Sequence, residues 1–338
     1  MKVVVDDKIP FIKGEVERLA DEVVYLPGAA IGPEDVRNAD ALIVRTRTLC
    51  NRQLLEGSSV RFIATATIGY DHLDTSYLEQ AGIHWTNCPG CNATSVGQYV
   101  RNALMEAEQA GLTNLSEATV GIIGYGHVGK AVYEALRPYV RRILVNDPPL
   151  ESREHLEHLY SIENITANCD IITLHTPLTL DGPYPTHHLV DEKFLNSLTH
   201  RPIIVNAARG GVVDEKALLQ AMDKGQVRQA IIDTWEGEPD INPVLLERVF
   251  IATPHIAGYS ADGKANATRM SLAMLAEWEK VTGYRAEGID KSVFQIIPPK
   301  SSEGRTGLRY SPTEDSKELK EHPEQFEKLR GNYPLRRE

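Results

Sequence analysis

Residues 120–129 read Val-Gly-Ile-Ile-Gly-Tyr-Gly-His-Val-Gly, an apolar run that passes directly into a GxGxxG motif. The apolar part predicts a buried parallel strand, and the glycine-rich part predicts a tight turn into a helix. In a unit of this kind Gly124 permits the turn, Gly126 lets the backbone approach a pyrophosphate, and Gly129 lets helix and strand pack closely. The stretch therefore predicts a dinucleotide-binding domain.

The residues around this motif indicate which dinucleotide binds. The backbone N–H groups of His127 and Val128, at the start of the helix, would point at the phosphates. The following strand ends at Asp147, about twenty residues beyond the motif, where a carboxylate bonds the adenosine ribose hydroxyls. That carboxylate would repel a 2′-phosphate, and Pro148 and Pro149 follow where an NADP enzyme would need arginine. We therefore predict NAD as the cofactor.

Apolar runs on both sides of the motif alternate with helical patterns. From residue 119 onward six runs predict strands, at Thr119–Ile123, Arg142–Asn146, Asp170–Leu174, Ile203–Val205, Ala230–Ile232 and Phe250–Ala252. The earlier part of the chain shows four further strand candidates, at Val3–Val5, Ala41–Val44, Phe62–Thr65 and Ile83–Trp85. Helical patterns lie at Phe11–Ala20, Thr75–Ala81, Thr94–Ala110 and Ser260–Thr282. This alternation predicts an α/β protein with two Rossmann-like, doubly wound parallel-sheet domains.

Length and composition limit the class of protein. A chain of 338 residues is expected to hold about two domains. The net charge of −11 disfavours a nucleic-acid-binding protein, because such proteins usually carry a basic face. No apolar run approaches the length of a membrane span, and the start of the chain becomes acidic too early for a secretory signal. We therefore expect a cytoplasmic enzyme without nucleic-acid or membrane partners.

Two of the cysteines, Cys88 and Cys91, have the spacing of a redox motif. A redox dithiol needs its first cysteine at a helix N-terminus, and a structural zinc site needs a second ligand pair that the chain lacks. We interpret the segment as a tight turn that carries two incidental thiols.

Three polar segments follow the last three predicted strands, and they contain Arg209, Glu238 and His255. Because the carboxyl ends of parallel strands meet at one edge of a sheet, we expect these side chains to lie there together. Arg209 offers a fork of donors to a substrate carboxylate, and His255 can take up and return a proton near neutral pH. Glu238 can stabilise the protonated imidazole. The set predicts an NAD-dependent dehydrogenase that acts on a hydroxy acid, with no metal site.

The order of these motifs resembles the D-isomer-specific 2-hydroxyacid dehydrogenases. The matching features are GxGxxG, the acidic strand end, and the segments Asn206–Gly210, Gly237–Pro239 and Thr253–Ile256. The resemblance implies that the arginine, glutamate and histidine of the three polar segments are the catalytic residues.

The resemblance also implies a split architecture. Residues 1–93 and 259–286 would form a substrate-binding domain, and the NAD domain of residues 94–258 would be inserted in it. Relatives carry a larger C-terminal domain that is used for dimerisation, so we expect residues 287–338 to form a shortened segment related to dimerisation. We expect a homodimer, formed through that segment or through the NAD domain. The composition of the segment is linker-like, with one short helix around Pro323–Leu329.

Finer features resemble the branch of this family that oxidises 4-phospho-D-erythronate on a route to pyridoxal 5′-phosphate. They include Ala64–Gly69, Pro89–Ala93, Asp181–Tyr184 and the pair Gly258–Tyr259. The resemblance assigns Thr46, Thr67 and Tyr259 to the substrate, and it assigns Thr176, Ala207, Ala208, Arg209, Asp233 and Gly258 to NAD. From its position after the strand Ala230–Ile232 alone, Asp233 could either reach the nicotinamide carboxamide or cap a turn.

The loop after the strand Ala41–Val44 gives a separate indication of a phosphorylated substrate. It reads Arg45-Thr46-Arg47-Thr48, and such a cluster can hold a phosphate by charge-assisted hydrogen bonds. An ordinary solvated loop is the alternative. With a phosphate held there and a carboxylate held by Arg209, the predicted substrate is a small phosphorylated hydroxy acid.

Two other functions remain open at this point. 3-Phosphoglycerate dehydrogenase, or another D-2-hydroxyacid dehydrogenase, would use the same cofactor and catalytic trio. A non-catalytic NAD-sensing regulator would have lost at least one of the three catalytic residues, and all three are present here.

Overall fold

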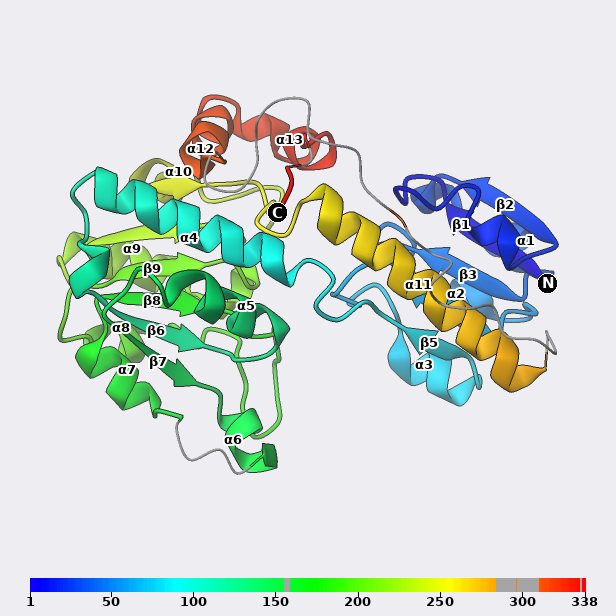
Figure 1. The fold of residues 1–338 in the computed structure, drawn as a ribbon, viewed down its shortest axis with the longest axis horizontal. Helices are drawn as coiled ribbons and strands as arrows, with labels where there is room; N and C mark the ends of the chain where they lie inside the picture. Colours follow the sequence, from blue (N-terminus) through cyan, green and yellow to red (C-terminus); the bar gives the residue numbers. More distant parts are fainter. Residues whose placement is uncertain (155–158, 284–295, 297–309, 335) are drawn as a thin grey trace. The chain divides into compact units, whose positions relative to one another are not determined.

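The structure is a computed structural model, and it describes residues 1–154, 159–283, 296, 310–334 and 336–338 (Figure 1). The chain divides into two compact units. The first comprises Met1–Asn92 with Ser260–Lys300, and the second comprises Ala93–Tyr259 with Ser301–Glu338. Each unit contains one parallel sheet with helices on both faces, so the predicted pair of doubly wound parallel-sheet domains is confirmed.

The sheet of the first unit has five strands in the order β2-β1-β3-β4-β5, all parallel. The strands are β1 (Lys2–Asp6), β2 (Glu22–Leu26), β3 (Ala41–Val44), β4 (Phe62–Thr65) and β5 (His84–Thr86). The edge strand β2 was not predicted, although Val23–Leu26 is an apolar run, and its residues are only partly buried at the edge of the sheet.

One predicted helix of the first unit is wrong. Within Phe11–Ala20 the chain forms only the single 3₁₀ turn η1 (Val16–Arg18). Phe11 and Gly14 both have a positive φ, of 62° and 88°, and a right-handed helix cannot pass through residues in that conformation.

Helices cover both faces of the first sheet. On one face the short helices α1 (Pro33–Val36), α2 (Arg52–Leu55) and α3 (Thr75–Gln80) share an apolar core with the alternate strand residues that point toward them. On the other face lies the long helix α11 (Ala261–Thr282), which begins at a Ser260 cap and ends at Gly283.

The sheet of the second unit contains all six predicted strands. They are β6 (Thr119–Ile123), β7 (Arg142–Asn146), β8 (Ile171–Leu174), β9 (Ile203–Asn206), β10 (Gln229–Ile232) and β11 (Ile251–Ala252). Their order is β11-β10-β9-β8-β6-β7, and every pair is parallel. Since β6 lies between β7 and β8, the strand order reverses next to the glycine-rich turn, where such sheets bind ligands.

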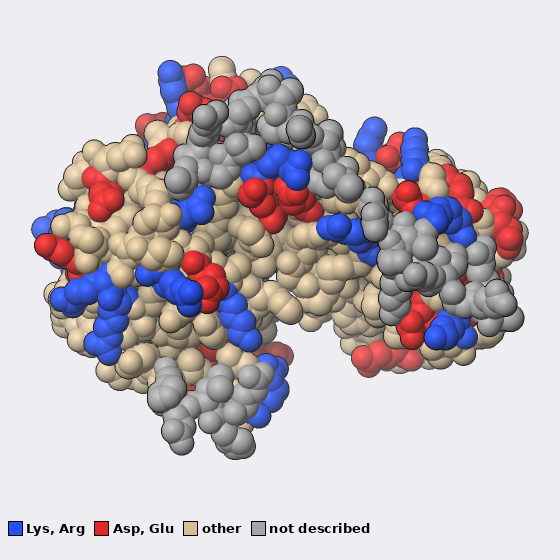
Figure 2. Space-filling view, viewed as in Figure 1, with Lys and Arg blue, Asp and Glu red and all other residues tan. Residues whose placement is uncertain are grey.

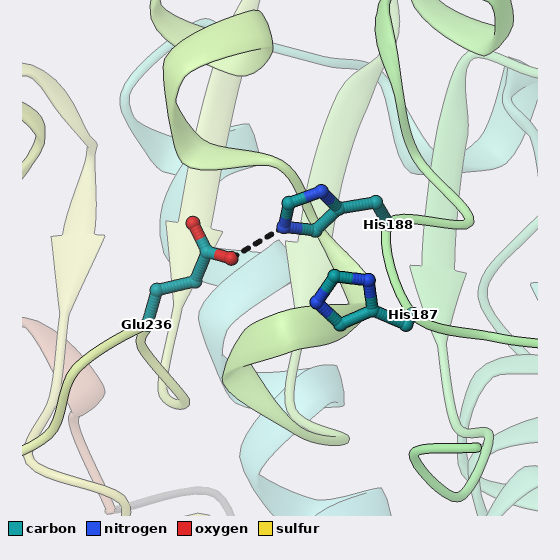
Figure 3. A group of neighbouring side chains, drawn as sticks. All are labelled: His187, His188 and Glu236. Carbon is teal, nitrogen blue, oxygen red and sulfur yellow. Dashed lines mark hydrogen bonds and ion pairs between the residues drawn. The ribbon is translucent and has the colours of Figure 1, made fainter. Parts of the chain in front are cut away.

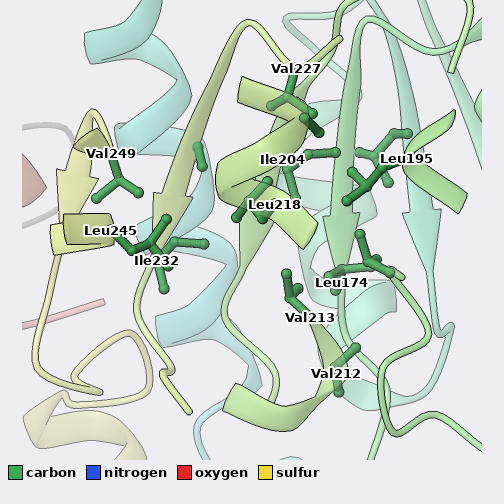
Figure 4. Packing of buried hydrophobic residues seen from close by; sticks show 14 of the residues in the cluster. Leu174, Leu195, Ile204, Val212, Val213, Leu218, Val227, Ile232, Leu245 and Val249 are labelled. Atoms are coloured by element: carbon green, nitrogen blue, oxygen red, sulfur yellow. The ribbon is translucent and has the colours of Figure 1, made fainter. Parts of the chain in front are cut away.

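Two apolar cores enclose this second sheet. One face packs against α4 (Ala93–Gln109) and α5 (His127–Leu136). The other packs against α7 (Ile162–Asn168), α8 (Glu192–Asn196), α9 (Glu215–Asp223) and α10 (Pro243–Arg248), and Figure 4 shows this core. The remaining short elements are η2 (Gly28–Ala30) in the first unit, and η3 (Leu115–Glu117), α6 (Pro148–Glu154) and η4 (Gly210–Val212) in the second.

The C-terminal residues 310–338, as far as they are described, fold onto the second unit. They form α12 (Pro312–Glu321), η7 (Pro323–Gln325) and α13 (Phe326–Gly331). Leu319 and Phe326 belong to the apolar core of this unit, and the Ser316 hydroxyl accepts a hydrogen bond from the N–H of Ala252 in the edge strand β11 at 2.9 Å. The helix predicted around Pro323–Leu329 is present as η7 and α13, but the expectation that this part is otherwise linker-like is wrong, because α12 precedes it. Residues 298–304 lie outside the described residues.

In the described part of the chain, no helix is long and apolar enough to span a membrane. On the face drawn in Figure 2, acidic and basic side chains are interspersed over the visible surface.

Candidate active site

The second unit places three of the predicted residues on neighbouring loops at one edge of its sheet. Arg209 follows β9, Glu238 follows β10 and His255 follows β11, and these strands are adjacent in the sheet. Each residue therefore follows its strand at the same edge of the sheet, and Glu238 and His255 are in direct contact there.

The imidazole of His255 is hydrogen-bonded to a carboxylate. Its Nδ1 lies 2.9 Å from Oε2 of Glu238, and the other oxygen of Glu238 accepts the N–H of Trp235 at 2.9 Å. Burial raises the pKa of Glu238, but the hydrogen bond and positive charge of His255, with a further contribution from Arg330, outweigh it and hold that pKa below its usual value. An ionised carboxylate requires Nδ1 to donate, so Nε2 is the nitrogen that can accept a proton from a substrate.

The loop that carries His255 is held by a buried carboxylate. His255 has a φ of 56°, in the left-handed region that residues other than glycine rarely adopt. Asp233 is 1% exposed, and its oxygens accept the hydroxyl of Thr253 at 2.7 Å and the N–H groups of Ile256 at 2.7 Å and Ala257 at 3.0 Å. This geometry matches the turn-capping alternative for Asp233, and it fixes the backbone on both sides of the histidine.

Asn206, at the end of β9, shapes the loop that carries Arg209. Its side-chain N–H₂ donates to the carbonyls of Arg209 at 3.0 Å and Thr234 at 3.2 Å, and its oxygen accepts the N–H of Ala208. One N–H of the Arg209 guanidinium donates to the carbonyl oxygen of Ala208, at 2.8 Å. Since an arginine has five N–H donors, it retains donors for a carboxylate.

The glycine-rich turn after β6 has the close packing that the motif predicts. Gly124 has a φ of 91°, and a Cβ there would lie 2.6 Å from the carbonyl oxygen of His175. A Cβ on Gly129 would lie 2.0 Å from the carbonyl oxygen of Gly124, so helix α5 packs tightly on the turn. Above Gly126 there is open space instead, with no atom within 4 Å. The backbone is therefore accessible at the position where a pyrophosphate would approach.

A nearby buried hydroxyl has no hydrogen-bond partner in the part of the chain that the structure describes. Thr176 follows β8, the strand next to β6, and its Oγ1 is buried without a hydrogen bond among the described residues. An unpaired buried hydroxyl is costly, and a bound dinucleotide would supply the missing partner. Ala207 and Ala208 follow β9 at the same edge, and Gly258 lies in the loop after β11. These residues fit a dinucleotide along this edge.

Asp147, predicted to bind the ribose, closes the glycine-rich turn. Its oxygens accept the N–H of Tyr125 at 2.7 Å and that of Leu150 at 2.9 Å. An ionised carboxylate has about four acceptor positions, so hydroxyls of a ribose can still be bound.

Comparison with known proteins assigns the chain to a family. The model of the D-isomer specific 2-hydroxyacid dehydrogenase, NAD binding domain, matches residues 92–257. The erythronate-4-phosphate dehydrogenase of Bacteroides thetaiotaomicron is 49% identical, over 100% of this chain and 97% of that protein. The protein of the same name from Escherichia coli is 39% identical, over 100% of this chain and 92% of its own length. A solved structure of NAD-bound 3-phosphoglycerate dehydrogenase from Entamoeba histolytica has a TM-score of 0.69 at 26% identity, covering 86% of this chain and 98% of that one.

The chain belongs to the erythronate-4-phosphate dehydrogenases of the D-isomer-specific 2-hydroxyacid dehydrogenase family. The predicted family is thus confirmed, and with it an NAD-dependent 2-hydroxyacid dehydrogenase.

In the first unit, the two arginines assigned to a phosphate differ in their surroundings. Arg45 binds the fully buried Asp6 through two hydrogen bonds, of 3.0 and 3.2 Å, so much of its charge is already used within the protein. Thr46 and Arg47 are exposed on the same loop. Thr67, after β4, donates its hydroxyl to the carbonyl of Gly69 at 2.7 Å.

Lys264, in the first turn of α11, was missed in the sequence. Burial and the neighbouring positive charge of Arg45 lower the pKa of Lys264 to about 8. Nothing in the sequence could have placed this residue near Arg45, because the two are joined only by the fold of the first unit. Two neighbouring cations indicate a place where an anion would be stabilised.

Glu236, two residues before Glu238, has a different partner. Figure 3 shows His188, whose Nε2 lies 2.6 Å from Oε1 of Glu236, with the ring of His187 stacked on it at a centroid distance of 4.0 Å. Glu236 and Glu215, at the start of α9, are also linked by two hydrogen bonds, in which the backbone N–H of each residue donates to the side-chain carboxylate of the other. The carboxylate of Glu236 is therefore bound to His188 and to the start of α9, whereas Glu238 binds His255.

The two closely spaced thiols are buried in the first unit. The Cys88 thiol lies 3.2 Å from the carbonyl oxygen of Ala267, and burial raises its pKa to about 11. Cys91 is also buried. A thiol that stays protonated at neutral pH is a poor redox nucleophile, so the interpretation as incidental thiols is consistent with these surroundings.

Replacing Glu238 by Gln should move the acidic limb of the kcat/KM profile to lower pH. The neutral amide no longer stabilises the protonated imidazole, so His255 stays deprotonated to a lower pH. Steady-state rates between pH 5 and pH 9 measure this. If the acidic limb of the variant falls at the same pH as that of the wild type, the Glu238 carboxylate does not stabilise the protonated His255.

Proposed function

We propose that this enzyme oxidises 4-phospho-D-erythronate to (R)-3-hydroxy-2-oxo-4-phosphooxybutanoate with NAD, as a step in pyridoxal 5′-phosphate synthesis. The observation that carries the substrate is the 49% identity along the whole chain with a protein named for that reaction. The paired His255 and Glu238 support the chemistry.

In the second unit, Arg209, His255 and Glu238 each have a separate role in the proposed reaction. Arg209 holds the substrate carboxylate by charge-assisted hydrogen bonds and polarises the C2–O bond. His255 accepts the proton of the C2 hydroxyl on Nε2, while Glu238 stabilises the imidazolium that forms. NAD, when bound, accepts the hydride from C2. One alcohol is thereby oxidised to a ketone, and the proton leaves through the histidine.

The first unit offers cations for the phosphate. We assign this role to Arg47 and Lys264, supported by Thr46, because Arg45 is largely committed to Asp6. The pKa of Lys264, lowered by burial and by the neighbouring arginine, supports this assignment, since a phosphate would relieve the repulsion between the two cations.

We also propose that the enzyme works as a homodimer in the cytoplasm. The four cysteines are all free and buried, which suits a reducing compartment. Sedimentation at micromolar concentration tests the dimer, and a monomer mass would contradict it.

Turnover measurements with NAD test the substrate. We expect 4-phospho-D-erythronate to be oxidised with a kcat/KM far above that for unphosphorylated erythronate or 3-phosphoglycerate. Arg47→Gln and Lys264→Gln should each raise KM for the phosphorylated acid by roughly ten- to a hundredfold, because each removes a charged hydrogen-bond donor.

Arg37→Gln is the matched control, because Arg37 is an exposed arginine of the first unit whose guanidinium binds the exposed Glu34. Its KM should remain near that of the wild type. Equal rates on erythronate with and without the phosphate would overturn the substrate assignment. A preference for 3-phosphoglycerate would instead indicate a 3-phosphoglycerate dehydrogenase.

A further inference from the structure

The C-terminal helix α13 brings a third charged residue to the catalytic pair. Arg330 lies near the end of this helix, and its Nη1 is 3.7 Å from Oε2 of Glu238. That same oxygen binds Nδ1 of His255 at 2.9 Å. The three side chains are only 17–26% exposed, so water screens their charges weakly. One carboxylate oxygen is therefore shared by an imidazole and a guanidinium.

Arg330 also contacts the tyrosine expected to bind the substrate. Its Nε lies 3.4 Å from the hydroxyl oxygen of Tyr259, in the loop that carries His255. The ring of Tyr333 packs edge-on against Tyr259, with centroids 6.2 Å apart. The guanidinium of Arg330 thus contacts both the carboxylate of Glu238 and the hydroxyl of Tyr259.

The end of the chain fixes α13 against this loop. Arg336 is fully buried and donates to the carbonyls of Ile256 and Ala257, directly after the catalytic histidine. It also donates to the carbonyl of Ser95 at 3.2 Å and to Oε1 of Gln98 at 2.9 Å, both in α4. The position of Arg330 is thus set by a segment that is hydrogen-bonded into the unit.

We propose that Arg330 is a positioning residue of the reaction: its guanidinium holds the oxygen of Glu238 that binds His255, and it orients the hydroxyl of Tyr259. The proposal rests on the proposed function only for the role of His255 as the base. It gives the C-terminal segment a part in the active site of its own chain.

The direction of the electrostatic effect follows from the charges around the pair. The carboxylates of Asp233 and Glu238 each interact favourably with a positive charge on His255, while burial raises the pKa of the neighbouring Glu215 to about 7. Arg330 is a positive charge beside the Glu238 carboxylate, and the buried Arg336 is another, bound to the loop that carries His255. Removing the charge of Arg330 should let the imidazole hold its proton to higher pH, by about 0.5 to 1 pH unit. This shift is opposite in sign to that expected for Glu238→Gln.

The experiment compares three variants of the full-length enzyme. Arg330→Met removes the charge, Arg330→Lys keeps it, and Lys328→Met removes an exposed charge two residues away on the same helix. For each, the kcat/KM profile is measured with NAD and 4-phospho-D-erythronate. The midpoint of the His255 ring titration is measured separately by NMR in the NAD complex, without turnover.

We expect Arg330→Met to move both the acidic limb and the NMR midpoint upward, and to raise KM as Tyr259 loses its partner. Arg330→Lys should have a midpoint close to that of the wild type, and Lys328→Met should have the same midpoint and KM as the wild type. An unchanged midpoint in Arg330→Met, or an equal shift in Lys328→Met, would overturn the proposal. Because the NMR midpoint requires no substrate, it still tests Arg330 if the proposed substrate fails in the wild type.

Discussion

The buried carboxylate of Asp233 is the interaction on which the catalytic arrangement depends. It stands at the end of β10 and accepts hydrogen bonds from the hydroxyl of Thr253 and from two consecutive N–H groups beyond His255. From the other side the buried Arg336 donates to the carbonyls of those same two residues. These partners hold the left-handed backbone at His255, together with the hydrogen bond from its own N–H to the carbonyl of Asp233. The imidazole then meets Glu238 because its backbone is already placed.

Most of the second unit could be predicted from the sequence, because buried parallel strands are continuous apolar runs and their carboxyl ends share one edge. Arg209, Glu238 and His255, which we propose as the catalytic residues, were placed at that edge for the same reason. The helix α12 was not found because it carries few apolar residues among many charged ones, and the edge strand β2 was overlooked although Val23–Leu26 is an apolar run. Both are stabilised by tertiary contacts, which a local pattern does not contain.

The roles of single charged residues were harder to predict than the fold. Arg45 has the sequence context of a phosphate ligand, but the structure pairs it with Asp6, which lies on another strand of the same sheet. Lys264 and Arg330 lie far along the chain from the motifs that they serve, and no spacing rule connects them. In each unit a charged residue from a distant part of the sequence therefore lies beside a residue that was singled out from the sequence: Lys264 beside Arg45, and Arg330 beside Glu238.

The most direct test of this account is amide hydrogen exchange at Ile256 and Ala257 in the wild type and in Asp233→Asn. The account predicts slow exchange in the wild type and exchange faster by about tenfold or more in the variant, because an amide cannot replace a carboxylate that accepts both N–H groups. The amide of Ile123 in β6 should be equally protected in both proteins. Fast exchange at Ile256 and Ala257 in the wild type, or equal protection in the variant, would contradict the claim that Asp233 holds the catalytic loop.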